Sequence, residues 1–126
     1  MPKFLTKLAC FGLSIFWLQT VQAEPLGRLL LFTTEDCSYC QAFMTDVGNG
    51  YSKTIVGQQL PMLQIDKQAP PKIYADLAKE LPLVPAFIIQ NMSGIEQTRF
   101  LGYGSEDLFW DKLESALLLL RTDTPK

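Results

Sequence analysis

An apolar run that leads into two closely spaced cysteines constrains this chain more than any other feature. Residues 29–32 (Leu-Leu-Leu-Phe) are strand formers, and residues 33–36 (Thr-Thr-Glu-Asp) form a short polar turn before Cys37 and Cys40. Because residues 41–44 suit a helix, we expect Cys37 at a strand-to-helix junction, where unpaired N–H groups and the helix dipole favour a thiolate. Such a thiolate can attack a disulfide and then be released by the second thiol.

Residues 1–23 have the layout of a secretory signal peptide. A basic start at Lys3 and Lys7 is followed by an apolar run over residues 8–18 and by Val21-Gln22-Ala23, which fits a small-residue cleavage site. A membrane anchor is the alternative, but the apolar run is shorter than the roughly 20 residues that span a bilayer. We therefore predict cleavage after Ala23 and export to the periplasm.

Cleavage would leave one domain over residues 24–126, with Cys37 and Cys40 as its only cysteines. Cys10 would be lost with the signal, since almost no apolar segment precedes it to support the alternative role of an acylated lipoprotein cysteine. Without the two lysines of the signal, nine basic residues remain against 13 acidic ones. No basic patch survives in this composition, which argues against a nucleic-acid partner.

Three kinds of chemistry are open to a cysteine pair in an exported chain. The first is a structural disulfide, but a bridge across two intervening residues closes a very small loop and stabilises little. The second is a zinc site, but the sequence has no histidine, and two thiolates do not complete a four-ligand site. The third is redox chemistry, which the C-x-x-C spacing favours.

The hydrophobic pattern predicts alternating strands and helices. Strand patterns cover residues 28–33, 60–65, 86–90 and 95–101; helix patterns cover 38–47 (ended by Gly48-Asn49-Gly50), 71–80 and the stretch from Ser105, with a short helical turn within 51–58. This order makes a βαβ unit followed by an antiparallel hairpin. We therefore predict an α/β fold with a mixed four-stranded sheet and helices on both faces.

Two of the predicted helices carry an apolar face that suits the core of such a fold. In the helix over 71–80 this face consists of Ile73, Tyr74, Leu77 and Ala78. In the last helix it consists of Leu108, Phe109, Leu113, Ala116, Leu117 and Leu120. We expect both faces to pack against the sheet.

Three features in register resemble the thioredoxin superfamily. They are Cys37-Ser38-Tyr39-Cys40 at the first strand–helix junction, Val84-Pro85 at the start of the third strand, and Arg99-Phe100-Leu101-Gly102 before the last helix. The likeness covers nearly all of residues 28–120 and implies a thioredoxin-like fold. Within the superfamily, the chain looks most like the small exported thioredoxin-like proteins of bacterial sulfur-oxidation systems, the SoxS/SoxW type.

The resemblance implies a role for each candidate site residue. Cys37 would be the attacking thiol and Cys40 the resolving thiol of a redox-active disulfide that needs no cofactor or metal. Pro85 matches the family's cis-proline, which shapes the substrate groove, and the peptide group of Val84 would pair with an incoming extended chain. The alternative for Pro85 is an ordinary loop proline that starts a strand. Tyr39 is either a substrate-facing aromatic or a partly exposed ring at a helix start.

Three departures from the family pattern bear on this chemistry. Asp36 stands where many thioredoxins carry a tryptophan, and with Glu35 it places negative charge near the sulfur, which opposes thiolate formation. Leu31 stands where thioredoxins keep a buried aspartate that helps move the proton of the resolving thiol. In this chain, water or a groove residue must accept that proton, or the thiol–disulfide exchange is slower. Ser38-Tyr39 is nearer to the intervening pair of a glutaredoxin than to Gly-Pro.

These observations predict a periplasmic thiol–disulfide oxidoreductase that reduces protein disulfides or persulfides of a sulfur-oxidation system. Its expected partners are client proteins and a membrane electron donor for re-reduction, and the chain itself is expected to be a monomer. One alternative is a dithiol oxidase that donates disulfides to exported proteins. Another is a non-catalytic thiol or Cu(I) binding module, for which Met44, Met62 and Met92 are the further sulfur ligands.

Overall fold

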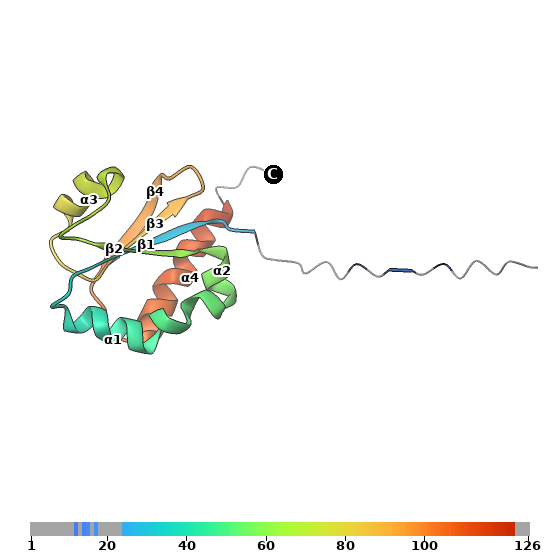
Figure 1. The fold of residues 1–126 in the computed structure, drawn as a ribbon, viewed down its shortest axis with the longest axis horizontal. Helices are drawn as coiled ribbons and strands as arrows, with labels where there is room; N and C mark the ends of the chain where they lie inside the picture. Colours follow the sequence, from blue (N-terminus) through green and yellow to red (C-terminus); the bar gives the residue numbers. More distant parts are fainter. Residues whose placement is uncertain (1–11, 13, 16, 18–23, 123–126) are drawn as a thin grey trace, which may run out of the picture.

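The computed structural model (Figure 1) describes residues 24–122 and, before them, only Gly12, Ser14, Ile15 and Trp17. The predicted signal peptide and its cleavage site therefore lie almost wholly outside the described residues, and both stay predictions. Within the described residues, no helix combines the length and the apolar character needed to cross a bilayer.

A four-stranded sheet forms the centre of the fold. Its strands are β1 (Gly27–Thr33), β2 (Met62–Asp66), β3 (Ala86–Asn91) and β4 (Glu96–Leu101). They lie in the order β2-β1-β3-β4, with β1 and β2 parallel and the other two pairs antiparallel. The predicted mixed sheet, a βαβ unit extended by a hairpin, is thus confirmed.

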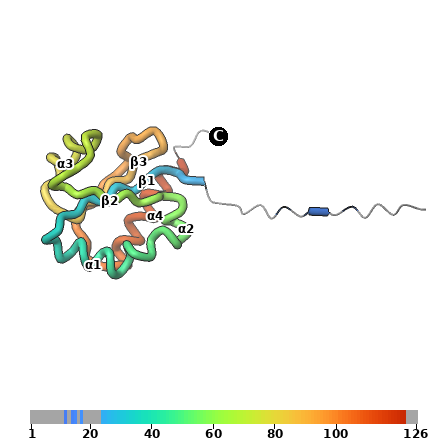
Figure 2. The backbone as a smooth tube through the Cα atoms, viewed as in Figure 1, coloured from blue at the N-terminus to red at the C-terminus, as the bar shows by residue number. Residues whose placement is uncertain are grey.

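Helices cover both faces of this sheet, as predicted. They are α1 (Ser38–Asp46), the 3₁₀ helix η1 (Gly48–Lys53), α2 (Ile55–Gln59), the 3₁₀ helix η2 (Lys72–Tyr74), α3 (Ala75–Glu80) and α4 (Glu106–Thr122). Figure 2 traces the chain with α1, α2 and α4 on one side of the sheet and α3 on the other. The two helical layers give the molecule two separate apolar clusters.

The central strand β1 contributes to both clusters. Leu29 and Leu31 pack in the larger cluster, beneath α1 and α4, whereas Leu30 and Phe32 pack in the smaller cluster, against α3. All four side chains are fully buried, although neighbouring positions on a strand point to opposite faces. A strand covered on both faces is apolar throughout, which explains the continuous run before the cysteines.

The segment after α1 agrees with the prediction in part. The helix ends before Gly48, and α2 lies close to the short helical turn predicted within 51–58, but the sequence did not predict that Gly48-Asn49-Gly50 begin η1. Tyr51 accounts for this path, because its buried hydroxyl donates a hydrogen bond of 2.7 Å to the carbonyl oxygen of Leu60. The hydroxyl of Thr54 then accepts the N–H of Gly57 at 2.9 Å and caps α2. The predicted helix over 71–80 is likewise divided, into η2 and α3.

Two side chains that the sequence assigns to the core are exposed instead. Ile73 is 82% exposed, and Leu108 is 53% exposed. In each case the next residue, Tyr74 or Phe109, takes the buried position. Neighbouring residues on a helix point in directions about 100–120° apart, so only one of each pair faces the sheet.

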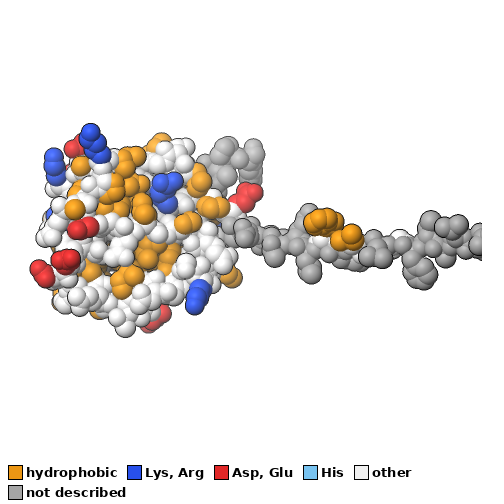
Figure 3. Space-filling view, viewed as in Figure 1, with side chains coloured by type: hydrophobic (Ala, Val, Ile, Leu, Met, Phe, Trp, Pro, Cys, Tyr) orange, Lys and Arg blue, Asp and Glu red, His pale blue; other side chains and the backbone are white. Residues whose placement is uncertain are grey.

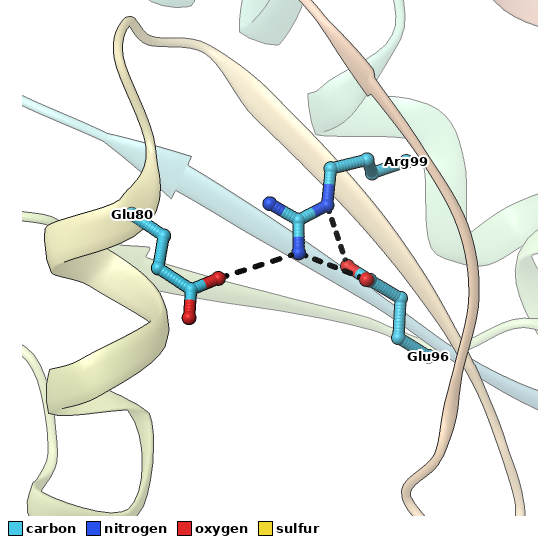
Figure 4. Close-up of polar contacts among 3 residues, drawn as sticks. All are labelled: Glu80, Glu96 and Arg99. Carbon is cyan, nitrogen blue, oxygen red and sulfur yellow. Dashed lines mark hydrogen bonds and ion pairs between the residues drawn. The ribbon is translucent and has the colours of Figure 1, made fainter.

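An ion-pair cluster joins α3 to the hairpin (Figure 4). The guanidinium of Arg99 on β4 donates two hydrogen bonds of 2.8 Å to the carboxylate of Glu96, and it lies 3.6 Å from a carboxylate oxygen of Glu80 on α3. These groups are partly exposed, so the cluster contributes little to stability. It nevertheless links the last residues of α3 to β4.

Candidate active site

Cys37 and Cys40 form a disulfide at the start of α1, with their Cα atoms 5.2 Å apart. Cys37 is the N-cap of α1 and has an extended backbone, and its Sγ accepts the N–H of Cys40 at 3.0 Å. This is the strand-to-helix junction that the sequence predicts. After reduction, the same N–H group and the helix dipole would favour a thiolate on Cys37.

Both cysteines are nearly buried, and Cys37 slightly less so than Cys40. Cys37 is 8% exposed and Cys40 is 4% exposed. The cysteine with the slightly larger exposure is also the one that caps the helix. Glu35 and Asp36 are exposed, so water screens their opposition to a thiolate on Cys37.

A polar cavity of about 290 Å³ lies beside Cys40. The hydroxyl of Thr33 accepts a hydrogen bond of 3.2 Å from the side-chain amide of Gln64, and both residues line the cavity. Leu31 offers no proton acceptor, because its side chain is aliphatic, and it is fully buried in the larger apolar cluster. The polar groups that lie near Cys40 are those of the residues that line this cavity.

The peptide bond between Val84 and Pro85 is cis. Ala86 pairs with Phe32, so this bond lies at the sheet edge from which β1 leads to the cysteines. The carbonyl oxygen of Pro85 accepts the N–H of Gly102 at 2.7 Å, and Gly102 has a φ of +82°, a conformation that favours glycine. The start of β3 and the end of β4 are thereby held together.

A groove of about 610 Å³ connects these elements. Tyr39 of α1 and Val84 of the proline loop both line it, so the structure brings three of the candidate segments to one surface. Its further lining residues are Leu83, Phe100, Leu101, Gly102, Tyr103, Gly104, Ser105, Leu108, Phe109 and Lys112. Tyr39 is exposed at the groove, which agrees with both alternatives for its ring.

Tyr103 is a site-supporting residue that the sequence analysis did not single out. Its hydroxyl donates a hydrogen bond of 2.8 Å to the carboxylate of Asp46 at the end of α1. Burial, this hydrogen bond and the nearby charges of Asp46 and Glu106 raise the pKa of Tyr103 to about 12. The contact ties the helix that carries the cysteines to the loop that walls the groove. In the sequence, only the position of Tyr103 directly after Gly102 indicates that it supports the site.

The methionines weighed as further sulfur ligands are dispersed. Met44 lines the cavity beside Cys40, Met62 is partly buried on β2, and Met92 is exposed in the turn between β3 and β4. Among the described residues there is no group of three or more His, Cys, Asp or Glu side chains that could share a metal ion.

Comparison with solved structures places this fold among the thioredoxins. The periplasmic thioredoxin SoxS from Paracoccus pantotrophus, in its reduced form, is 25% identical, with a TM-score of 0.64 over 78% of this chain and 99% of SoxS. Thioredoxin from Malassezia sympodialis is 14% identical (TM-score 0.57, 75% of this chain and 80% of that one). The reduced C-terminal domain of DsbD from Neisseria meningitidis is 19% identical (TM-score 0.51, 72% and 81%).

No protein-family model and no curated protein sequence matches the chain. The assignment therefore depends on the shared fold, on the identity with SoxS and on the cysteine pair at the start of α1. The chain is a thioredoxin-like protein of the thioredoxin superfamily, similar to SoxS, and its Cys37–Cys40 pair is a thiol–disulfide redox centre.

Proposed function

We propose that the protein is a periplasmic reductase of protein disulfides or persulfides in a sulfur-oxidation system. The observation that carries the proposal is the position of the Cys37–Cys40 disulfide, which caps α1 beside the groove that Tyr39 and Val84 line. The likeness to a periplasmic thioredoxin and the signal-peptide pattern support the compartment and the reductive direction. An oxidising compartment implies a membrane electron donor that returns the dithiol to its reduced form.

The reductive cycle has two exchange steps. The Cys37 thiolate attacks one sulfur of the client disulfide, forms a mixed disulfide and releases the first client thiol. Cys40 then gives up its proton and attacks the Sγ of Cys37, which releases the second client thiol and closes the Cys37–Cys40 disulfide. A persulfide follows the same route, with the client thiol released first and hydrosulfide second. Two electrons and two protons from the donor restore the dithiol.

Substitution of each cysteine separates the two steps. Cys37→Ser removes the attacking sulfur, so we expect turnover of a disulfide-bonded client protein to be lost. Cys40→Ser leaves the attack intact but blocks resolution, so the mixed disulfide should accumulate in near-stoichiometric amount. Mass spectrometry of the reaction products, without reductant, detects it directly. Full turnover by the Cys37→Ser variant, or no trapped adduct in Cys40→Ser, would refute this cycle.

A further inference from the structure

The surfaces on the two sides of the disulfide differ in polarity and charge. Glu35 and Asp66 line a polar cavity of about 400 Å³, which shares Thr33, Thr34 and Gln64 with the cavity beside Cys40. Acidic side chains are visible over the turn between β1 and α1, at the left of Figure 3. On the side of Tyr39, the groove of about 610 Å³ is lined mainly by apolar residues. A client segment that approaches the sulfurs thus meets two unlike surfaces.

The groove gathers several large apolar side chains that are exposed to solvent. Leu83, Leu101 and Leu108 are all exposed there, although they come from three different segments of the chain. A hollow lined by such side chains next to a reactive group is a typical binding surface for an apolar ligand group. Because Tyr39, which stands between the two cysteines in the sequence, lines the groove, we expect a client segment to lie in it.

Among the residues that the structure describes, Lys112 is the only charged one that lines the groove. It follows Leu108 by one turn of α4, so the two side chains lie on the same helix face. Its ammonium lies 5.4 Å from the centroid of the Phe100 ring. No carboxylate of the described residues is within ion-pair distance of it. The groove therefore offers a cation whose charge a client carboxylate can complement.

We propose that this groove selects client segments that carry a bulky apolar residue close to the reacting cysteine and a carboxylate within reach of Lys112. The proposal depends on the proposed function, since it names the client that the same site takes. The apolar residue would pack against Leu83, Leu101 and Leu108. The carboxylates of Glu35 and Asp66 repel an acidic segment from the other side of the disulfide, so the charges also fix the direction in which the segment lies.

Peptide disulfides test the charge preference. Each peptide is a symmetrical disulfide dimer with a phenylalanine beside its cysteine and with Glu, Gln or Lys two, three or four residues from the cysteine on either side. The Cys40→Ser variant is used, so that attack by Cys37 stops at the mixed disulfide, whose formation rate is followed by mass spectrometry. At the best position we expect the Glu peptide to react about two- to fivefold faster than the Gln peptide, the range of an exposed ion pair.

Variants of Lys112 then test whether the preference for the Glu peptide depends on this side chain. In the Cys40→Ser background, Lys112→Gln should abolish the preference for Glu, and Lys112→Glu should reverse it in favour of Lys. Lys53→Glu changes the net charge equally but lies outside the groove, so it should keep the preference. The preference should also shrink at 1 M salt, where charges are screened within about 3 Å. Equal rates for the three peptides, or an unchanged preference in Lys112→Glu, would overturn the proposal.

Two further measurements complete the test. Leu108→Ser should lower the rate for the phenylalanine peptide relative to a serine peptide, whereas Leu118→Ser, at an exposed leucine of α4 outside the groove, should not. Unchanged selectivity in Leu108→Ser would contradict the apolar part of the proposal. Hydroxyethyl disulfide, which is small and uncharged, separates the two levels of the argument. If Cys37 fails to react with it, the proposed function fails; if it reacts but the peptides are not distinguished, only the groove preference fails.

Discussion

At the scale of single residues, two buried tyrosines form hydrogen bonds that join separate segments of the fold. Tyr51 donates its hydroxyl hydrogen bond to Leu60, and Tyr103 donates its own to Asp46. Burial raises the pKa of Tyr51 well above its usual range, and that of Tyr103 reaches about 12. Both groups therefore hold their protons more tightly in the folded protein than in the unfolded chain, where a tyrosine pKa is about 10.

This difference predicts a loss of stability at high pH. A pKa that is raised on folding contributes stability that is fully present below the unfolded value and is lost as pH rises through the folded value. The free energy of unfolding, from urea titrations of the oxidised protein, should therefore fall steadily above about pH 10. Tyr51→Phe should unfold more easily by about 0.5–1.5 kcal/mol at pH 8, because its hydrogen bond is lost.

The same variant should lose less additional stability between pH 9.5 and pH 11 than the unsubstituted protein does. Tyr39→Phe, at an exposed ring, is the matched control and should follow the unsubstituted protein at every pH. An identical alkaline slope in Tyr51→Phe and the unsubstituted protein would show that Tyr51 does not contribute to the alkaline loss.

At the scale of elements, the position of α1 decides where the cysteines lie. Phe43 is the buried residue of α1 that joins the helix to the rest of the core. Its ring centroid lies 4.9 Å from those of Phe87 on β3 and Phe109 on α4, and 5.4 Å from that of Tyr103. One side chain thus connects the helix of the redox centre to the sheet, to α4 and to the wall of the groove.

Truncation of this ring should be among the most damaging single changes. Phe43→Ala removes a fully buried aromatic side chain and leaves a cavity, so we expect a loss of about 3–5 kcal/mol in the free energy of unfolding. Phe43→Leu keeps most of the apolar volume and should cost distinctly less. Urea unfolding followed by fluorescence of Trp110, which lies 5.2 Å from Phe109 between ring centroids, measures both. Equal stability of the two variants would contradict this role of Phe43.

The elements also show what the sequence could predict and what it could not. The run over residues 29–32 predicts a strand buried on both faces, because a strand of this kind has no polar positions. The 3₁₀ helix η1 was not predictable, since its path depends on the hydrogen bond from Tyr51 to Leu60 nine residues later. Periodicity also placed Leu108 in the core, because it does not show which of two adjacent apolar residues faces the sheet.

The candidate site likewise has parts that the sequence predicts and parts that it does not. The C-x-x-C spacing and the preceding strand predict Cys37 at the start of a helix, because the turn that joins them is local in sequence. The groove combines Tyr39, the proline loop, the end of β4 and α4, which only the tertiary fold brings together. Lys112 and Tyr103 lie far from the cysteines in sequence, so no spacing rule indicates them.

At the scale of the whole molecule, the fold joins a redox centre to an asymmetric surface. The sheet and the two helical layers hold the Cys37–Cys40 pair at one edge, with the apolar groove on one side and polar cavities on the other. Among the described residues, the groove combines exposed apolar side chains with one charged side chain, that of Lys112. What the molecule does with them depends on the direction in which electrons flow through the cysteine pair.

The reduction potential of the Cys37–Cys40 pair tests this direction most simply. The purified protein is equilibrated in a series of glutathione and dithiothreitol redox buffers, and the fraction of the disulfide form is read by thiol alkylation and mass spectrometry. The account predicts a potential near that of thioredoxin, about −270 mV, as expected of a reductant that is supplied with electrons from outside. A potential near that of DsbA, about −120 mV, would mark a disulfide donor and contradict the proposed direction.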